Sequence, residues 1–433
     1  MSSQPDTRPA ARFWISAALI GCTPSAPTYW ADVQPILEGR CVNCHQQDAI
    51  GSMALDSYSS AAIWGDPIAA VTSDRSMPPW PAETGPEYDY DWRLTDDQIA
   101  TLEAWVEAGA PEGDPDEIGD PLTGVASALS RTDLTLTMPQ AYTPSSEAPD
   151  DYRCFVIPWT ETETQYITGF NVLPGNNEMV HHVAAFLISS DNLLGDSVFE
   201  QLDEWESEEG APGYACFGGP SGPTGDLQLP IQQIAQWVPG NQGLDLPDGT
   251  GIEVLPGSEI VLQLHYSIGD NGGETDQTSI EFKLDDNVTN RAVYAPWLSI
   301  NWPLGALEIP ANSEETVEAE GDPRGFFELL NPSINLDNGF MIHSSMLHMH
   351  RIGERASIAL HKADGDVESL VSIPEWDFDW QLSYQLSEPL RFEEGDSLAL
   401  ECTYNNTQDV DVVWGEGSDD EMCVGNLYIS LLD

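Results

Sequence analysis

Alternation of apolar and polar residues is the feature that most constrains how this chain can fold. It runs through Ile260–Tyr266, Trp380–Leu386 and Leu398–Tyr404. Successive side chains of a β-strand point to opposite faces of a sheet, so the alternation predicts strands with one buried face. Asp364-Gly365 predicts a hairpin turn, and beyond residue 112 only Ser197–Glu206 offers a helical pattern. We therefore expect two antiparallel, jelly-roll-like β-sandwich domains here.

The beginning of the chain has helical patterns instead. Residues 29–39 form an amphipathic stretch, and Thr95-Asp96-Asp97-Gln98 is a capping box that opens a second helix with Leu102 and Trp105 on its apolar face. Gly, Pro and acidic residues then follow in a composition typical of a linker. These patterns predict, in chain order, a signal peptide, a tether, a small all-α domain, a linker and two β-sandwich domains, at residues 1–21, 22–27, 28–112, 113–130, 131–287 and 288–433.

The N-terminus predicts export. Arg8 and Arg12 precede a mainly apolar run, Phe13–Gly21, which is much shorter than the ~20 residues that span a membrane. The run ends in Leu-Ile-Gly-Cys22, which resembles a bacterial lipobox, so we expect Cys22 to be lipidated; ordinary export with an unused Cys22 is the alternative. The folded part is then periplasmic or at the cell surface, where disulfides form, and reaches the membrane only through its lipid.

The net charge excludes one class of partner. The formal charge is −59, from 73 Asp and Glu against 14 Lys and Arg. Such a surface repels phosphate backbones, so we expect no nucleic-acid partner. Salt screens the self-repulsion, which indicates a marine or halophilic habitat as a hypothesis. The hydrophobic share of 41% argues against a disordered chain.

Cys41-Val42-Asn43-Cys44-His45 is a C-x-x-C-H haem attachment signature. Two thiols one helical turn apart add to the haem vinyl groups, and His45 then becomes an axial iron ligand. A disulfide-exchange motif would not need the histidine. The stretch 28–112 resembles a small c-type cytochrome domain, which implies covalent haem c, an external electron donor, and Met77 of a stiff Pro-rich loop as the distal ligand. Met53 is the alternative distal ligand.

The four remaining cysteines predict two disulfides. They are Cys154, Cys216, Cys402 and Cys423. An even number in an exported protein favours complete pairing, but three pairings are possible and the spacing does not choose among them.

The histidines are few and grouped. His348 and His350 share one face of a strand, so two imidazoles can converge on one metal. His181 and His182 are adjacent, so a shared metal requires a bend or strand end there. Imidazole-rich groups suit copper, and haem on the same chain indicates redox-active copper. His343 and His361 are expected to be structural.

Four segments resemble the copper type II, ascorbate-dependent monooxygenases, the family of peptidylglycine α-hydroxylating monooxygenase and dopamine β-monooxygenase. They are Met179–His182, Leu262–Tyr266, Ser345–His350 and Glu421–Cys423, and they occur in the family's order. The resemblance implies two coppers with a solvent-filled cleft between them. One stores an electron and is held in the first sandwich by His181, His182 and His265. The other is catalytic and is held in the second by His348, His350 and Met422. The resemblance also implies the disulfide pairs Cys154–Cys216 and Cys402–Cys423.

The chain departs from the peptide-hydroxylating members near the expected catalytic copper. Met346 stands two residues before His348, where those enzymes have a carboxylate-binding arginine. Val424–Tyr428 is longer by two residues than their Asn-Leu-Tyr, which puts substrate roles for Asn426 and Tyr428 in doubt. A peptide substrate that ends in a carboxylate is therefore not expected.

The function implied by this resemblance is hydroxylation of a C–H bond in an unidentified small molecule by dioxygen, with electrons supplied through the fused haem c. One alternative is a non-enzymatic copper and haem electron-transfer or copper-binding lipoprotein. Another is a zinc hydrolase at His348 and His350, which lacks a general-base Glu in a recognised motif.

Overall fold

The computed structural model describes most of the chain. The described residues are 26–47, 51, 53–83, 85–122, 128–146, 150–192, 195–208, 210–216, 219–222, 232–239, 243–268, 273–415 and 417–432. The predicted signal peptide, the lipidation site Cys22 and most of the tether lie outside them. Among the described helices, none has both the length and the apolar character needed to cross a bilayer.

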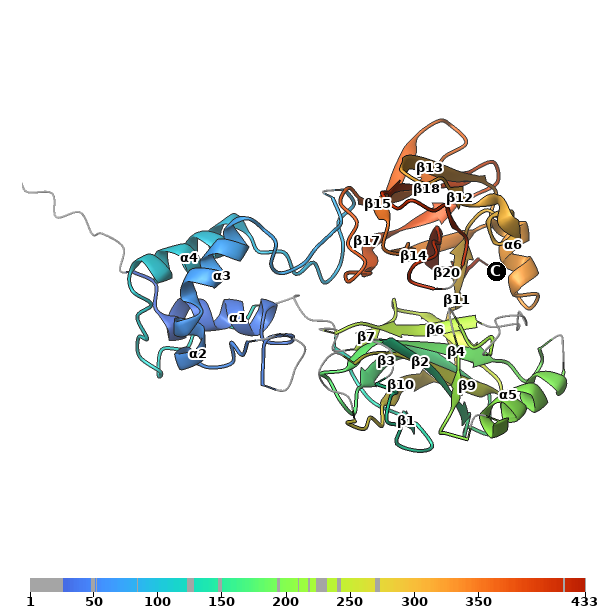
Figure 1. Cartoon of the computed structure of the whole chain (residues 1–433), viewed down its shortest axis with the longest axis horizontal. Coiled ribbons are helices and arrows are strands. Elements are labelled where there is room, and N and C mark those ends of the chain that lie inside the picture. The colour runs from blue at the N-terminus through green and yellow to red at the C-terminus, as the bar shows by residue number, and fades with distance from the viewer. Residues whose placement is uncertain are drawn as a thin grey trace, which may run out of the picture.

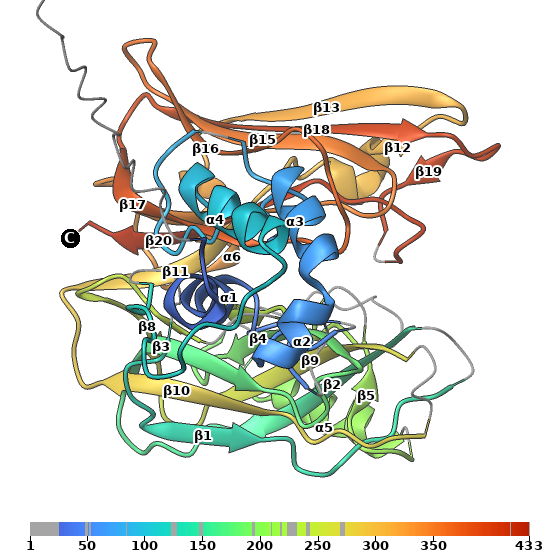
Figure 2. The same ribbon diagram turned by 90° about the vertical axis from the view of Figure 1, so that its left-hand side faces the viewer.

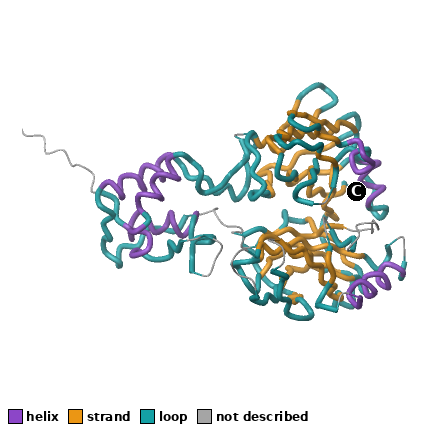
Figure 3. Tube along the Cα trace, in the orientation of Figure 1, coloured by secondary structure: helices purple, strands orange, loops and turns teal. Residues whose placement is uncertain are grey.

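The first helices form a separate unit around their own core (Figures 1 and 3). They are η1 (Tyr29–Val33), α1 (Gln34–Arg40), α2 (Tyr58–Ile63), α3 (Gly65–Ser73) and α4 (Asp96–Glu107), where η1 is a single π-helical turn. Leu102 and Trp105 are fully buried at its centre. The predicted capping box at Thr95 and Gln98 is present, with both reciprocal hydrogen bonds. The start and end of this unit meet where Tyr29 N donates to Pro111 O at 2.9 Å.

Two sheets make the first β-sandwich, with α5 (Ser197–Glu208) beside it. The strands are β1 (Leu134–Thr137), β2 (Asp150–Pro158), β3 (Gln165–Leu173), β4 (Val180–Ile188), β5 (Tyr214–Ala215), β6 (Gln232–Trp237), β7 (Leu244–Asp245), β8 (Thr250–Val254), β9 (Glu259–Ser267) and β10 (Ser279–Asp285). One sheet has the order β5-β2-β9-β4-β6, and the facing strands run β1-β10-β3-β8, with β7 on β3. Apolar side chains of both sheets, such as Leu262 and Ile280, fill the space between them.

The second β-sandwich follows, and its core lies between a four-stranded sheet, β13-β18-β15-β16, and the strands β11-β20-β14-β17. Its elements are β11 (Asn290–Trp297), η2 (Trp302–Ala306), β12 (Glu308–Ile309), β13 (Ser313–Gly321), α6 (Arg324–Leu330), β14 (Phe340–His348), β15 (Gly353–His361), β16 (Val367–Ile373), β17 (Ser383–Phe392), β18 (Ser397–Asn406), β19 (Val412–Val413) and β20 (Val424–Leu431). The short strands β12 and β19 pair with each other.

The two sandwiches share one continuous sheet. β11 pairs in parallel with β8 of the first sandwich, at Asn290–Thr250 and Arg291–Gly251, and pairs antiparallel with β20 of the second. The sandwiches therefore lie one above the other in Figure 1, with the helical unit in front of both in Figure 2.

The prediction of a mainly antiparallel β-sandwich architecture is confirmed, with three local differences. β17 begins at Ser383 and not at Trp380, because Trp380 N closes a turn onto Asp377 O at 3.1 Å. The helix at Ser197 is real and two residues longer than its sequence pattern. Helix α6 was not predicted.

Both disulfides that the family resemblance implied are present. Cys154 bonds Cys216, and Cys402 bonds Cys423. The second bond holds β18 to the chain immediately before β20.

Candidate metal centres

Three histidines of the first sandwich converge at a β-bulge. His182 on β4 lies directly opposite His265 on β9, and the pairing register shifts between Val180 and His182. A bulge adds one residue to one strand and redirects its side chain, so adjacent histidines can share a face. One nitrogen from each of His181, His182 and His265 lies within 4.8 Å of the others. The bend that the sequence required is this bulge.

Hydrogen bonds orient these imidazoles for a metal. His265 Nε2 donates to Asp150 Oδ1 at 2.9 Å, which leaves its Nδ1 as the atom that can bind a metal. That atom lies 3.4 Å from His182 Nδ1. Tyr152 stacks on His265 with ring centroids 4.1 Å apart. His181 Nδ1 is buried and has no hydrogen-bond partner among the described residues.

Burial and neighbouring imidazoles disfavour the protonated forms of His181 and His182. Burial lowers the pKa of His182 well below its usual value, and His265, His181 and His348 lower it further. Burial and His265 also lower the pKa of His181. Neutral imidazoles with unshared lone pairs are the form that binds copper, so these three residues fit a copper ion.

The second histidine pair lies where β14 ends. The rings of His348 and His350 have centroids 5.0 Å apart. His348 Nδ1 donates to the side-chain oxygen of Gln381, and His350 Nδ1 donates to the carbonyl of Asp420 at 3.1 Å. Each ring therefore keeps its Nε2 for a metal. Burial lowers the pKa of both, and that of His350 to about 3, so both are neutral.

A buried carboxylate ties Met422 to this pair. Glu421 is fully buried, and its side chain accepts the N–H groups of His350 at 2.8 Å, Ile352 at 2.9 Å and Met422 at 3.3 Å. Burial raises the pKa of Glu421 to about 7, while those N–H groups act in the opposite direction. Tyr404 also donates to the Met422 carbonyl at 2.8 Å. Glu421 thus holds the main chain of Met422 next to that of His350. A soft thioether would suit Cu(I) as a third ligand to two imidazoles.

The two histidine groups face each other between the sandwiches. His348 is among the charges that lower the pKa of His182, and Arg351 reaches Asp150 at 3.9 Å. Asp150 therefore contacts both sides, since it also accepts from His265.

Residues 329–430 match the family model "Copper type II ascorbate-dependent monooxygenase, C-terminal domain". This span contains His348, His350 and Met422. DBH-like monooxygenase protein 1 of Gallus gallus is 25% identical over 320 residues, which cover 70% of this chain and 47% of that protein. These matches support the copper type II, ascorbate-dependent monooxygenase family.

Two further proteins are similar over much of this chain. The DBH-like monooxygenase protein 1 of Homo sapiens is 25% identical over 58% of this chain and 39% of its own length. Tyramine beta-hydroxylase of Caenorhabditis briggsae is 21% identical over 70% of this chain and 50% of its own length. The chain thus spans about half the length of the curated relatives it matches, or less. Among solved structures, an allantoicase aligns with a TM-score of only 0.15 at 11% identity, over 66% of this chain and 78% of that one, so this alignment carries no argument.

The C-x-x-C-H segment follows α1 directly. Both Cys44 N and His45 N donate to Cys41 O, at 3.2 and 2.9 Å, so the motif forms a helical turn. Cys41 and Cys44 are free of disulfides. Burial lowers the pKa of His45, and the main chain of Met53 acts in the opposite direction. Two free thiols one turn apart beside a neutral imidazole fit covalent haem.

The two candidate distal methionines lie in different places. The main chain of Met53 contacts the His45 imidazole, which is the proximal side of a haem held there. Met77 lines a small cavity with Thr72 of α3, Ile99 of α4 and Leu94, which lies just before α4. This difference favours Met77.

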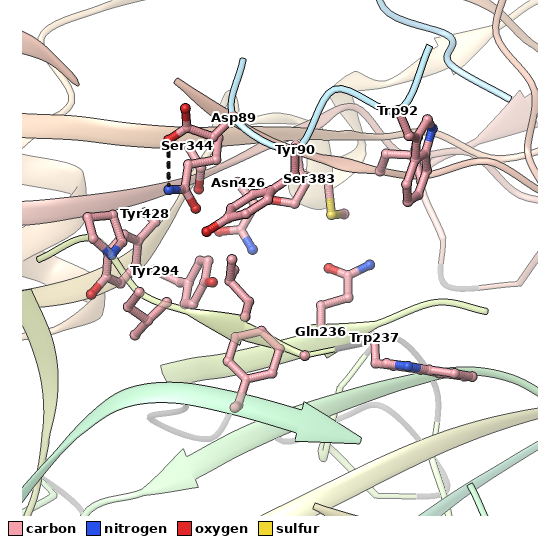
Figure 4. A pocket seen from close by; sticks show the side chains of 18 of the residues that line it. Asp89, Tyr90, Trp92, Gln236, Trp237, Tyr294, Ser344, Ser383, Asn426 and Tyr428 are labelled. Atoms are coloured by element: carbon pink, nitrogen blue, oxygen red, sulfur yellow. Dashed lines mark hydrogen bonds between the residues drawn. The ribbon is translucent and has the colours of Figure 1, made fainter. Parts of the chain in front are cut away.

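A second cavity opens where the helical unit meets both sandwiches (Figure 4). Its empty space is about 1180 Å³, part of which is open to solvent. The lining residues are Asn43, Trp80, Asp89, Tyr90, Trp92, Phe170, Gln236, Trp237, Gly243, Leu244, Leu246, Pro247, Tyr294, Ser344, Met346, Leu382, Ser383, Gln385, Asn426 and Tyr428. Asn43 belongs to the C-x-x-C-H motif, and Met346 stands two residues before His348.

The other two histidines have partners of their own. His343 Nε2 lies 2.8 Å from Ser430 Oγ, and burial lowers the pKa of His343 to about 4. His361 Nδ1 lies 3.0 Å from Glu320.

Sequence reasoning missed Asp150, Gln381 and the role of Glu421. Of these, only Glu421 had a signal, since it stands beside Met422.

Proposed function

We propose that this protein is a copper-dependent monooxygenase that hydroxylates a C–H bond of a small molecule, with electrons supplied through covalent haem c. The observation that carries the proposal is the second histidine pair. Glu421 joins the main chain of His350 to that of Met422, and both lie with His348 in the region that matches the family model.

Two copper ions are assigned to two ligand sets. His181, His182 and His265 would hold an electron-storing copper, and His348, His350 and Met422 a catalytic one. Copper bound in this way supplies one-electron chemistry and a site for dioxygen. The hydroxylation takes two electrons for each dioxygen, which leaves one oxygen atom in the product and one in water.

The chain's own groups hold the ligands in place. Asp150 fixes the orientation of His265, and Gln381 does the same for His348. Glu421 fixes the main chain at His350 and Met422. Such partners prevent the imidazoles from rotating and raise their basicity toward a metal.

Haem c is assigned to Cys41, Cys44, His45 and Met77, as the route by which an external donor supplies electrons. The fusion of the motif to the monooxygenase region supports this route. So does the cavity, because Asn43 of the motif lines it together with Met346 and Asn426. We also propose export to the periplasm or cell surface, with Cys22 lipidated.

The test uses the full chain loaded with copper and haem. Dioxygen uptake is measured with a panel of small C–H substrates, and products are identified by mass spectrometry with ¹⁸O₂. We expect uptake that needs both copper and substrate, and ¹⁸O in an alcohol product. Reversible copper and haem oxidation without any product would instead support a non-enzymatic electron-transfer protein.

Electron supply is tested separately. The haem is reduced first, excess reductant is removed, and the protein is mixed with dioxygen and the substrate found above. Haem oxidation should keep pace with product formation. If product forms from ascorbate while the reduced haem stays reduced, the electron route through the haem is wrong.

A further inference from the structure

The helical unit contributes directly to the cavity beside Met346. Trp80, Asp89, Tyr90 and Trp92 all come from the connection between α3 and α4. Figure 4 shows the Tyr90 ring extending into the cavity. We call residues 85–92 the wall segment.

Backbone pairing holds the wall segment on the second sandwich. Asp89 N donates to Gln385 O at 2.9 Å, and Ser387 N donates to Glu87 O at 3.0 Å. The wall segment thus extends the sheet beyond β17. Its position is set by the sandwich and not by a loose tether.

Aromatic packing fixes it further. Tyr88 is 7% exposed, and its hydroxyl donates to Leu370 O at 3.0 Å. Trp80 packs edge-on against Tyr384, with ring centroids 5.2 Å apart. Tyr88 belongs to the core of the second sandwich, and Trp80 packs against that core. The wall segment is therefore a built part of the cavity.

Tyr90 has a backbone conformation that bulky residues rarely adopt. Its φ is +58°, in the left-handed region. Such a conformation costs on the order of 1 kcal/mol and persists only where its surroundings enforce it. Here the pairing at Asp89 enforces it and directs the ring inward. Burial raises the pKa of Tyr90, and Asp89, Asp245 and Asp248 raise it further, so the hydroxyl stays protonated.

The charge of the cavity is one-sided. Among the residues that line it, Asp89 is the acid, and none is Lys, Arg or His. An anion would find no cationic partner in this cavity. It would also be repelled by the chain as a whole, whose formal net charge is −59. The aromatic side chains of Trp92, Trp237 and Tyr294 provide apolar contact.

We propose that the wall segment determines substrate specificity, with Tyr90 limiting the size of the substrate and Asp89 favouring uncharged or cationic molecules over anions. This inference rests on the proposed function, because it takes the cavity beside Met346 as the substrate site. The helical unit, and not only the two sandwiches, then shapes that site.

The first test measures binding and does not need turnover. Benzylamine, benzyl alcohol and benzoate share one ring and differ in charge, and each is titrated calorimetrically into the copper- and haem-loaded chain. We expect benzylamine and benzyl alcohol to bind and benzoate to bind at least tenfold more weakly. Asp89→Asn should reduce the preference for benzylamine over benzyl alcohol by about threefold, as expected for an exposed charge. Glu87→Gln is the matched control, because it removes one charge from the same segment outside the cavity lining.

The second test concerns size. Tyr90→Gly removes the ring and suits the positive φ, so the variant should melt no lower than wild type. We expect 2-naphthylmethylamine to gain at least about fivefold over benzylamine in this variant. An unchanged ratio in a variant that melts like wild type overturns the role of Tyr90. Failure of all three one-ring probes to bind wild type, or equal binding of benzoate, overturns the assignment of the cavity.

These outcomes are separable from the proposed function. If wild type hydroxylates a substrate while Tyr90→Gly and Asp89→Asn leave its selectivity unchanged, the wall segment has no role and the monooxygenase proposal stands. If the probes bind as expected and no substrate is oxygenated, the cavity assignment stands as a binding site and the monooxygenase proposal fails.

Discussion

Asp150 accepts the Nε2–H of His265 at 2.9 Å, across two neighbouring strands of the first sandwich. The same carboxylate lies 3.9 Å from Arg351, which follows His350 directly. One acid therefore orients a predicted ligand of the first copper and contacts the segment that carries a predicted ligand of the second. A carboxylate in this position fixes the tautomer of the imidazole and increases its basicity.

We predict that Asp150→Asn weakens copper binding at the first site by about 10- to 100-fold. A neutral amide at this position cannot raise the basicity of the His265 imidazole as the carboxylate does. Competition with a Cu(I) chelator measures this, and one of two bound coppers should be lost first. Asp120→Asn, in an exposed stretch that makes no such contact, is the control. Retention of both coppers at wild-type affinity would show that Asp150 does not support the ligand.

Met422 offers a second test. Met422→Leu keeps the buried volume and removes the sulfur, so it should cost less than about 1.5 kcal/mol of stability. We predict that it lowers Cu(I) affinity at the second site by at least about tenfold and lowers turnover at least as much. Met349→Leu is the matched control. Met349 lies between His348 and His350 in the sequence, and its side chain is fully buried in the core of the second sandwich. Equal loss of copper in both variants would indicate a packing effect.

Local patterns in the sequence predicted several of the strands and showed that the histidines are grouped. Period-two alternation depends only on which face of a strand is buried, so β9 and β18 follow from it directly. The adjacent histidines implied a bend, but the bulge at His181 depends on how β4 pairs with β9. Asp150 could not be connected to His265 because 115 residues separate them.

The wall segment was unpredictable for the same reason. Asp89 and Gln385 are 296 residues apart in the sequence, and their side chains also form a hydrogen bond. The hydrogen bonds that pair the wall segment with β17 join main-chain groups, which leave no signal in the sequence. Gly, Pro and acidic residues at positions 83–91 resemble a loop. Contacts with β16 and β17 give that segment a fixed place. The proposed role of the wall segment in specificity therefore depends on long-range contacts that one sequence does not reveal.

One measurement distinguishes Met77 from Met53 as the distal haem ligand. A thioether ligand stabilises the reduced haem, so Met77→Ala should lower the reduction potential by on the order of 0.1 V while covalent haem remains attached through Cys41 and Cys44. Met53→Ala should leave the potential near wild type, because the Met53 main chain lies on the His45 side. A spectroelectrochemical titration of both variants checks this, and a drop confined to Met53→Ala would make Met53 the ligand.

Glu259 links stability to pH at a distance from either copper site. Its Oε2 is buried without a hydrogen-bond partner among the described residues. The pKa of Glu259 is raised from 4.5 to about 7, mainly by burial and also by the charges of Asp203 and Glu206. The folded state therefore binds the proton more tightly than the unfolded state. The contribution of this group is full below pH 4.5, falls as pH rises toward 7, and is lost above 7.

We accordingly predict that Glu259→Gln, which cannot ionise, stabilises the protein near pH 8 by about 1 kcal/mol, after allowance for partial exposure, and raises the melting temperature by roughly 2 °C. Near pH 4 the variant and wild type should melt together, because Glu259 is then mostly protonated in both the folded and the unfolded state. Glu163→Gln, an exposed acid of the same sandwich, controls for the general loss of negative charge. A gain of the same size at both pH values, or an equal gain in Glu163→Gln, would mean that the buried carboxyl is not the cause.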